Sequence, residues 1–172
     1  FQAKNNNELV AIFGNFINRV VVLTNKYYNG DVPNKNKFLD VDTEVLNSIY
    51  ESISKIEKSI SKFRFREACN ELINIARSGN KYLADQEPWK TIKVDESRVE
   101  TVMYVSLEIS AILSVISEPF LPNTSTKLQA ILNSKAHSLQ WTWDNLNEKN
   151  LIVNTGVRIN KAELLFSKIE DK

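Results

Sequence analysis

Residues 42–62 read DTEVLNSIYESISKIEKSISK and repeat apolar side chains every three or four positions. This spacing places the apolar side chains on one face of an α-helix, whereas a strand would need strict alternation. The opposite face is polar and charged, with Glu51, Lys55 and Lys58 on it, so we expect it to meet solvent. The segment therefore predicts an amphipathic helix, whose inward stripe consists of Val45, Leu46, Ile49, Ile53, Ile56, Ile60 and Phe63.

The same helical spacing recurs on both sides of this segment. Upstream, an apolar stripe starts after Asn7, which suits a helix N-cap, and stops at the turn signal Asn29-Gly30. Downstream, Pro88 must end a helix, because the residue before a proline avoids helical geometry. Five helices are predicted in all, over residues 7–28, 42–62, 64–85, 96–117 and 124–133. The third helix is expected to turn inward Phe65, Ala68, Cys69, Leu72, Ile75, Ala76 and Leu83.

The segments between and after the helices are predicted to be irregular. Residues 31–40 are polar and form a loop, and residues 85–95 form a link that carries Trp89. Trp141, Trp143 and residues 151–159 look extended, and residues 161–168 are expected to add a final turn of helix.

The composition favours a single helical domain. The chain has 172 residues but only four Gly and four Pro, which is sparse punctuation for an all-β domain with its frequent turns. We therefore expect an all-α fold, an antiparallel bundle of about five helices with an irregular C-terminal tail. In this prediction residues 1–172 form one domain, with the bundle in 1–135 and a tail in 136–172 that packs back on it.

Charge and cysteine content narrow the classes of function. A balance of 22 Lys and Arg against 21 Asp and Glu gives a net charge of +1, so any basic surface must be local. Cys69 is the only cysteine, which excludes a disulfide framework and fits a reducing cytosol. We find no apolar run of membrane-spanning length and no signal peptide, and we expect a cytoplasmic protein. The chain begins at Phe1 and not at Met, so we expect a fragment.

A catalytic or metal centre finds little support in the sequence. His137 is the only histidine, it follows the fifth helix in a polar segment, and we expect it on the surface. No G-x-S-x-G elbow, P-loop or G-x-G-x-x-G motif is present, so neither a hydrolase nor a nucleotide site is indicated. One histidine cannot supply the two Glu-x-x-His pairs of a di-iron bundle. We therefore predict no catalytic residue and no metal ligand in this chain.

Two groups of polar and aromatic residues are better candidates for a binding site. Trp89 follows Pro88 among polar neighbours, so it either packs over the bundle end or offers a stacking platform to an unpaired base. Asn15 and Arg19 lie one helical turn apart on a single face. That face is either merely solvated, or its amide and guanidinium read base edges while Lys26 meets phosphate.

Four motifs together resemble a known family. Residues 15–19, NFINR, continuing to KYYNG at 26–30, are similar to the first helix of methionyl-tRNA synthetase anticodon-binding domains. Asn80-x-Tyr82 through Glu87-Pro88-Trp89 resembles the N-x-Y…P-W segment of that family. The remaining motifs are the proline break EPFLP at 118–122 and the closing segment from Gly156 through Ile159 to LFSKIE at 165–170. These motifs span nearly the whole chain in the family's order.

The resemblance implies a site for the first anticodon base, a cytosine, formed by Asn15, Arg19 and Trp89. We expect the Trp89 indole to be substantially exposed at the end of the bundle, near Asn15 and Arg19. In the family the tryptophan stacks on the flipped-out base while the two helix residues read its polar edge. Ala84 stands where some relatives have an acidic residue, so a contact at that position is not carried over. The expected contacts to the tRNA backbone come from Asn18, Lys26, Lys90 and Lys93.

The resemblance also implies a parent protein, a methionine–tRNA ligase of the class I aminoacyl-tRNA synthetases. Its catalytic domain is expected to precede Phe1 and to use ATP and magnesium, with or without a structural zinc ion. The expected partners are the anticodon stem-loop of methionine tRNA and the protein's own catalytic domain, and neither DNA nor a membrane. Two alternatives stay open, the anticodon-binding domain of another class I synthetase and a helical module that binds a protein through Trp141 and Trp143.

Overall fold

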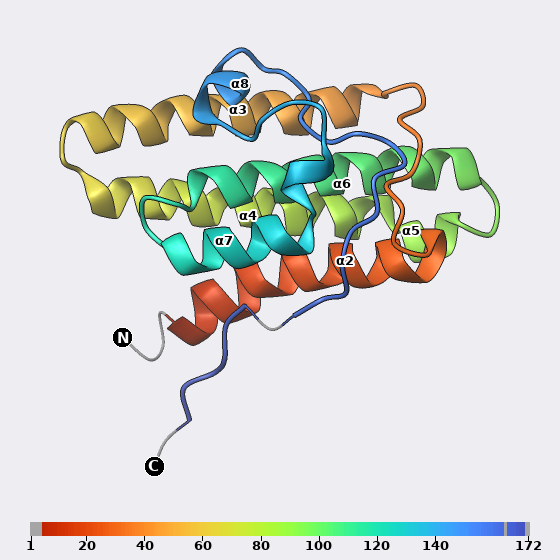
Figure 1. The fold of residues 1–172 in the computed structure, drawn as a ribbon, viewed down its shortest axis with the longest axis horizontal. Coiled ribbons are helices and arrows are strands. Elements are labelled where there is room, and N and C mark those ends of the chain that lie inside the picture. Colours follow the sequence, from red (N-terminus) through yellow and green to blue (C-terminus); the bar gives the residue numbers. More distant parts are fainter. Residues whose placement is uncertain (1–4, 164, 171–172) are drawn as a thin grey trace.

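Two long antiparallel helices, α3 (Asp40–Ser61) and α4 (Phe65–Gln86), form a hairpin, and α6 (Glu96–Ile116) packs against both (Figure 1). The computed structural model describes residues 5–163 and 165–170, and the helices within them confirm the predicted all-α fold. The other elements are the π-helix η1 (Asn5–Gly14), α2 (Asn15–Tyr28), α5 (Pro88–Thr91), α7 (Pro122–Ile131), the 3₁₀ helix η2 (Ser134–Ala136) and α8 (Trp143–Asn147).

Helix α6 is the centre of the fold. Every residue from Thr101 to Ile116 is buried, because α2, α3, α4, α5, α7 and α8 all pack around this helix. The helix has 21 residues, and an 18-residue window within it has a mean hydropathy of 1.7. By length and composition it could cross a membrane, so the expectation that the chain has no apolar run of that length is wrong. Since 94% of that window is buried inside the protein, α6 is apolar all round as a core helix.

The first predicted helix, residues 7–28, consists of two consecutive helices, η1 and α2. α2 ends at the predicted turn, where Asn29 and Gly30 both have positive φ, 53° and 85°. A close approach between α2 and α4 depends on Gly79, since a Cβ there would lie only 2.7 Å from Cζ of the buried Phe16. The missing side chain thus brings the start of α2 against the second half of α4.

At the turn between α3 and α4, two phenylalanines do not face inward as predicted. Phe63 and Phe65 were expected to point inward, but they are 81% and 51% exposed and pack edge-on against each other. Phe63 takes a positive φ of 58°, which reverses the chain and breaks the helical phase between the two helices. The apolar pattern of either helix therefore cannot be extended across this turn.

The remaining helix boundaries lie close to those predicted. α3 begins two residues early, at Asp40, and the Leu39 N–H donates to the Asp42 carboxylate at 2.9 Å. α7 begins at Pro122 and not at Thr124, since proline suits the first turn of a helix, where an N–H would have no partner.

The expectation of an extended tail is wrong in part, because Trp143 begins α8 and because Thr155 and Gly156 form a turn, in which Gly156 has a positive φ of 85°. Residues 151–159 lie against the loop that follows α2. The Val32 N–H donates to the Val157 carbonyl at 2.9 Å, and the Ile159 N–H donates to the Gly30 carbonyl at 2.8 Å. A buried carboxylate on α6 holds the same segment, because Glu108 accepts from the Ile152 and Val153 N–H groups at 2.9 and 3.0 Å. Burial raises the pKa of Glu108 to about 7, although these two hydrogen bonds oppose the shift.

Two expectations about the C-terminal part are wrong. His137 is buried and not on the surface, since its Nε2 lies 3.1 Å from the Leu132 carbonyl oxygen and its Nδ1 accepts from the Asn154 N–H at 2.9 Å. Burial lowers the pKa of His137, so the ring is a neutral structural link between α7 and the tail. The final turn of helix expected over 161–168 is absent from the described residues of that segment, which are irregular.

Candidate nucleic-acid interface

Trp89 lies on a short helix where the chain turns from α4 toward α6. Glu87 takes a positive φ of 44° at the end of α4, and Pro88 then starts the four-residue helix α5. The expected irregular link over 85–95 is thus partly helical. Trp89 is half-buried against the core, so the expectation of a substantially exposed indole is wrong. The short helix folds back on the bundle, which covers part of the ring.

The structure brings Arg19 and Trp89 together, although they lie on different helices. The Arg19 guanidinium carbon lies 5.4 Å from the centre of the Trp89 ring, within the range of a cation–π interaction. Asn80 on α4 fixes the same arginine, because Arg19 Nη1 donates to Asn80 Oδ1 at 3.5 Å. Asn80 Nδ2 in turn donates to the Ile12 carbonyl at 2.9 Å, within η1. These contacts hold the guanidinium between Trp89 and α4.

The other predicted contact residues on α2 lie at the surface. Asn15 and Asn18 are exposed on α2, and Asn15 lies one turn before Arg19. Lys26 is exposed near the end of α2, and its ammonium lies 5.6 Å from the centre of the Tyr27 ring. Asn15 therefore shares a helix face with Arg19, whereas Lys26 lies about 10 Å further along the helix axis.

The two lysines that follow Trp89 are less alike. Lys90 is exposed and forms an ion pair with Glu87 at 2.8 Å, so part of its charge is already compensated. Lys93 is exposed in the turn between α5 and α6. Of the two, Lys93 offers the stronger contact to an anion.

A buried polar network holds the helix ends around α5. Arg98, at the start of α6, donates to both carboxylate oxygens of Asp42 at 2.7 and 2.9 Å. The same guanidinium donates to Gln86 Oε1 at 2.7 Å, and the Tyr82 hydroxyl donates to Asp42 at 2.6 Å. The network thus joins the start of α3, the end of α4 and the start of α6, and α5 lies between the last two.

The protonation of Asp42 follows from this network. Burial by itself would raise the pKa of Asp42, but the hydrogen bonds from Arg98, Tyr82 and the Leu39 N–H outweigh it, so the pKa is lowered. The carboxylate is therefore ionised at neutral pH and balances the Arg98 charge. Sequence reasoning missed this role, because Asp42 had the appearance of an ordinary residue at the start of a helix.

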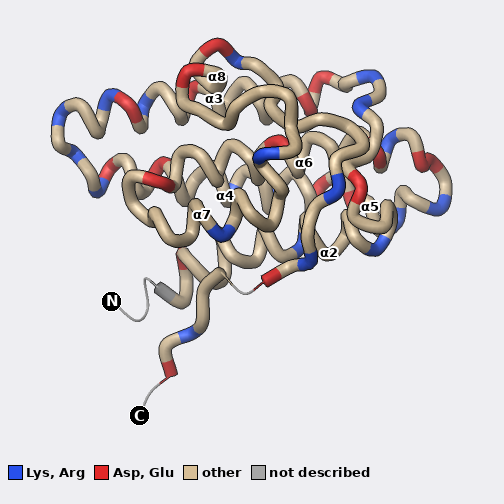
Figure 2. The backbone as a smooth tube through the Cα atoms, in the orientation of Figure 1, with Lys and Arg blue, Asp and Glu red and all other residues tan. Residues whose placement is uncertain are grey.

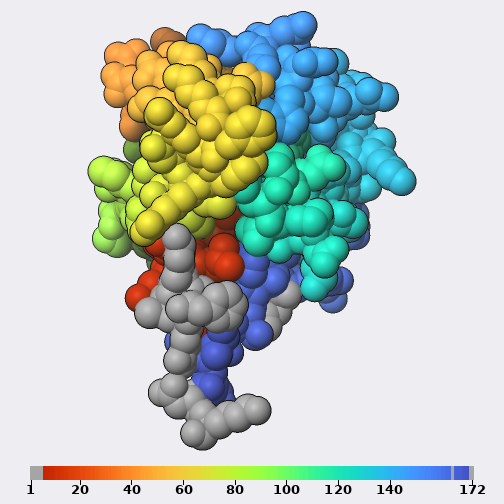
Figure 3. All heavy atoms as spheres, turned by 90° about the vertical axis from the view of Figure 1, so that its left-hand side faces the viewer, coloured from red at the N-terminus to blue at the C-terminus, as the bar shows by residue number. Residues whose placement is uncertain are grey.

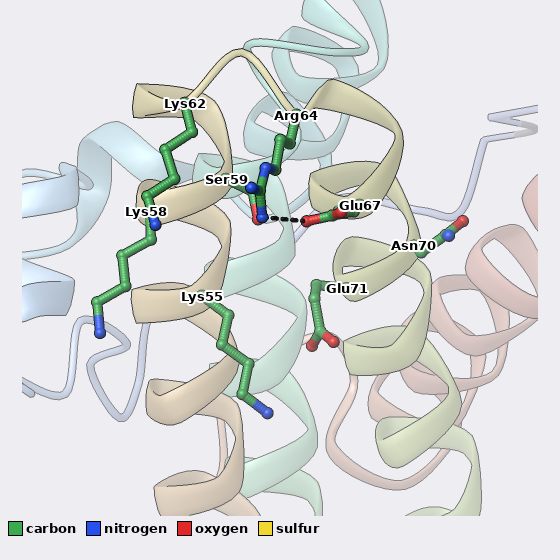
Figure 4. A pocket seen from close by; sticks show the side chains of 8 residues that line it. All are labelled: Lys55, Lys58, Ser59, Lys62, Arg64, Glu67, Asn70 and Glu71. Carbon is green, nitrogen blue, oxygen red and sulfur yellow. Dashed lines mark ion pairs between the residues drawn. The ribbon is translucent and has the colours of Figure 1, made fainter.

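Elsewhere, the surface carries mixed charges. Figure 2 shows Lys and Arg interspersed with Asp and Glu over most of the backbone. An open groove of about 390 Å³ lies between α3 and α4 near their turn, far along the hairpin from Trp89. As Figure 4 shows, Lys55, Lys58 and Lys62 line its α3 wall, whereas Glu67 and Glu71 line its α4 wall. Arg64 also lines this groove, so four cationic side chains face two acidic ones.

We also searched the structure for a metal site and for the protein-binding surface proposed around Trp141 and Trp143. Among residues 5–163 and 165–170, no group of three or more His, Cys, Asp or Glu side chains could hold a metal ion. Trp141 and Trp143 are half-buried against the core, and Trp141 Nε1 donates to the Ile152 carbonyl at 3.0 Å. The Trp141 ring also stacks at 4.9 Å on His137. Both tryptophans therefore pack within the protein.

Comparisons with known proteins agree with the fold and with the sequence motifs. A family model described as the anticodon binding domain of methionyl tRNA ligase matches residues 32–172. The methionine–tRNA ligase of Christiangramia forsetii is 59% identical over 174 aligned residues, covering 100% of this chain and 25% of that protein. The ligase of Flavobacterium psychrophilum is 52% identical, again over 100% of this chain and 25% of that protein.

A solved structure with the same fold is apo methionyl-tRNA synthetase from Mycobacterium tuberculosis. It superposes with a TM-score of 0.86 at 20% identity and covers 99% of this chain and 34% of that chain. The chain thus spans about a quarter of the length of the two curated relatives described above. The family model matches most of the length of this chain, and the chain therefore belongs to the family of anticodon-binding domains of methionyl-tRNA ligases.

Proposed function

We propose that this chain binds the CAU anticodon of methionine tRNA, as one domain of a methionine–tRNA ligase. The bundle over 1–135 forms the binding surface, and the tail over 136–172 closes the bundle and packs back. A catalytic domain elsewhere in the protein then uses ATP and magnesium to attach methionine to the tRNA. Relatives named methionine–tRNA ligase extend well beyond the aligned region, which supports a further domain of this kind.

The observation that carries this proposal is the contact between Arg19 and Trp89. The half-buried indole leaves part of its ring at the surface, where an unpaired cytosine can stack. The guanidinium lies 5.4 Å from the ring centre and can donate to polar atoms on the edge of a base placed there. Asn15, exposed on the same helix face, can add an amide contact to that edge. Single-stranded loops are where such edges are accessible, because a deep groove hides them in A-form duplexes.

Contacts to the RNA backbone would come from the exposed side chains around the pair. Asn18, Lys26 and Lys93 can meet phosphate or ribose groups, and Lys90 can do so if its ion pair with Glu87 opens. Such contacts orient the anticodon loop without reading its sequence.

Substitution of Arg19 by alanine in the full-length ligase tests the proposal. We expect the Arg19→Ala variant to lose discrimination at the first anticodon position, because an edge-reading arginine contributes specificity. The measurement compares the affinities of two methionine tRNAs that differ only at that base, C or U. The wild type should prefer C, and the variant should bind both with similar affinity.

The matched control is Arg158→Ala. It removes a tail arginine that forms an ion pair with Asp31, which follows α2. We expect this control to keep the preference for C. If Arg19→Ala weakens both tRNAs by the same factor, Arg19 touches only the backbone and the proposed site is misplaced. If the wild type binds neither tRNA, the proposed function is wrong.

A further inference from the structure

One face of α4 carries a continuous row of cationic and amide side chains. Its members are spaced by four, four, three and four residues, so they lie on one face of the helix. All of them are exposed, and none is acidic. We call this row the α4 stripe, and its members are Arg66, Asn70, Asn74, Arg77 and Lys81.

The α4 stripe lies between two flanks of different character. On one flank, Gly79 and Asn80 face α2 and η1, where they contact Phe16, Arg19 and the Ile12 carbonyl. On the other flank, the acidic residues of α4 turn toward α3. Glu67 and Glu71 line the groove shared with α3, and Asp85 forms an ion pair with Lys81 at the end of the stripe. Asn70 lines the same groove as Glu67 and Glu71, and Lys81 lines a second groove with Asp85, so the acidic side chains of α4 border the α4 stripe on this flank only.

The stripe connects the Trp89 site with the far end of the molecule. Lys81 directly follows Asn80, which holds Arg19, whereas Arg66 lies beside the turn between α3 and α4. Their separation of 15 positions corresponds to about 22 Å along a helix axis. That turn, coloured yellow, faces the viewer in Figure 3, and it presents the exposed rings of Phe63 and Phe65.

We propose that the α4 stripe binds the sugar-phosphate backbone of the same tRNA whose unpaired base lies at Trp89. This inference rests on the proposed function and extends it from the anticodon loop to the stem. Arginine and lysine neutralise phosphates, and the asparagine amides can donate to phosphate oxygens or pair with ribose hydroxyl groups. The tRNA stem then lies along α4, running from the Trp89 site toward the turn between α3 and α4.

The chemistry of the stripe favours RNA over a protein partner. A protein interface usually has an apolar centre with aromatic anchors, whereas the stripe itself has no apolar member. A row of donors along one helix face fits a chain of regularly spaced anions. The exposed aromatic pair lies beyond the last member of the stripe, where it can contact a ribose or an unpaired base.

The experiment neutralises two arginines of the stripe in the full-length ligase. The double variant Arg66→Gln/Arg77→Gln removes two positive charges and keeps residues that favour a helix. Each phosphate contact contributes about 0.7–0.9 to the slope of log K against log salt, so the slope should become shallower by roughly 1.5. Near 0.1 M salt this corresponds to about a tenfold or greater loss of affinity for methionine tRNA.

The matched control is the double variant Lys127→Gln/Lys135→Gln, which makes the same charge change on α7 and η2. Both lysines are exposed, and α7 packs against α6 whereas η2 packs against α7. We expect the control to keep the salt slope of the wild type. The stripe variant should also keep the wild-type preference for C at the first anticodon position, because it leaves Arg19 and Trp89 unchanged.

Each remaining outcome would overturn the inference. Equal losses in the two double variants would mean that only net charge matters. A stripe variant with unchanged affinity and salt slope would refute the stem contact while leaving the anticodon site intact. A lower melting temperature of the stripe variant alone would show that the stripe packs against another part of the ligase. If the wild type fails to bind the tRNA, the proposed function fails together with this inference.

Discussion

Substitution of Asp42 by asparagine should destabilise the fold strongly. The side chain is fully buried and accepts hydrogen bonds from Arg98, Tyr82 and the Leu39 N–H. Asparagine keeps the shape but removes the charge, and its Nδ2 group cannot accept a hydrogen bond. The Arg98 side chain, only 14% exposed, would then carry an uncompensated charge inside the protein.

The size of the effect follows from the burial of both partners. Removing one partner of a buried ion pair costs about 3–5 kcal/mol, since the remaining charge stays desolvated. An exposed pair in the same chain provides the scale for comparison. In the pair of Asp31 with Arg158, the side chains are 46% and 64% exposed, so Asp31→Asn should cost less than about 1 kcal/mol.

The assay is urea-induced unfolding of the 172-residue chain, followed by far-UV circular dichroism at neutral pH. A double-mutant cycle with Arg98→Met separates the interaction from the two single effects. We expect Asp42→Asn/Arg98→Met to be less destabilised than the sum of the single variants, because methionine removes the stranded charge and keeps most of the volume. The coupling should be about 1–3 kcal/mol.

The pH dependence gives an independent check of the same reasoning. Because the pKa of Asp42 is lowered in the fold, its contribution to stability is present above the unfolded value of 3.8. That contribution is lost as the pH falls through the folded pKa. The wild type should therefore approach the Asp42→Asn variant in stability below about pH 4. A loss below about 1 kcal/mol for Asp42→Asn at neutral pH, or strict additivity in the cycle, would refute the reasoning.

Two further predictions concern the site and the tail. Trp89→Ala should weaken binding of methionine tRNA to the full-length ligase by on the order of 1–3 kcal/mol. Because the indole is only half-buried, the melting temperature should fall less than for a core tryptophan, and a collapse of stability with normal tRNA affinity would contradict the site. Glu108 has a folded pKa of about 7 against an ordinary 4.5, so the stability of the wild type relative to Glu108→Gln should decline as the pH rises between these values. Urea unfolding measures this decline, on the order of 3 kcal/mol in total, and a constant difference would show that Glu108 has an ordinary pKa in the fold.

The helices could be predicted from the sequence because their signals are local. Apolar spacing, the Asn29-Gly30 pair and Pro88 each act within a few residues, and the five helices predicted for the bundle lie close to observed helices. The candidates Arg19 and Trp89 were also selected from local patterns, since one lies on a polar helix face and the other follows a proline. Nothing local showed that their side chains meet.

Contacts between residues far apart in the chain decided what the sequence left open. His137 has polar neighbours in sequence, yet it is buried because the Leu132 carbonyl and the Asn154 N–H both reach its ring. Asp42 and Arg98 are separated by 56 positions, and Glu108 meets the N–H of Ile152 44 positions away. Periodic patterns in the sequence do not predict such pairs, because a pattern depends only on residues that are close together in the chain.

The candidate site shows the same division. The sequence alone determined that α2 carries Asn15 and Arg19 on one polar face, because helical periodicity requires it. Only the tertiary structure decided that Arg19 lies over Trp89, since this needs the close approach of α2 to α4 at Gly79 and the hydrogen bond from Asn80. Periodicity fixes which way a side chain faces on its own helix, whereas packing between helices fixes which side chains it meets.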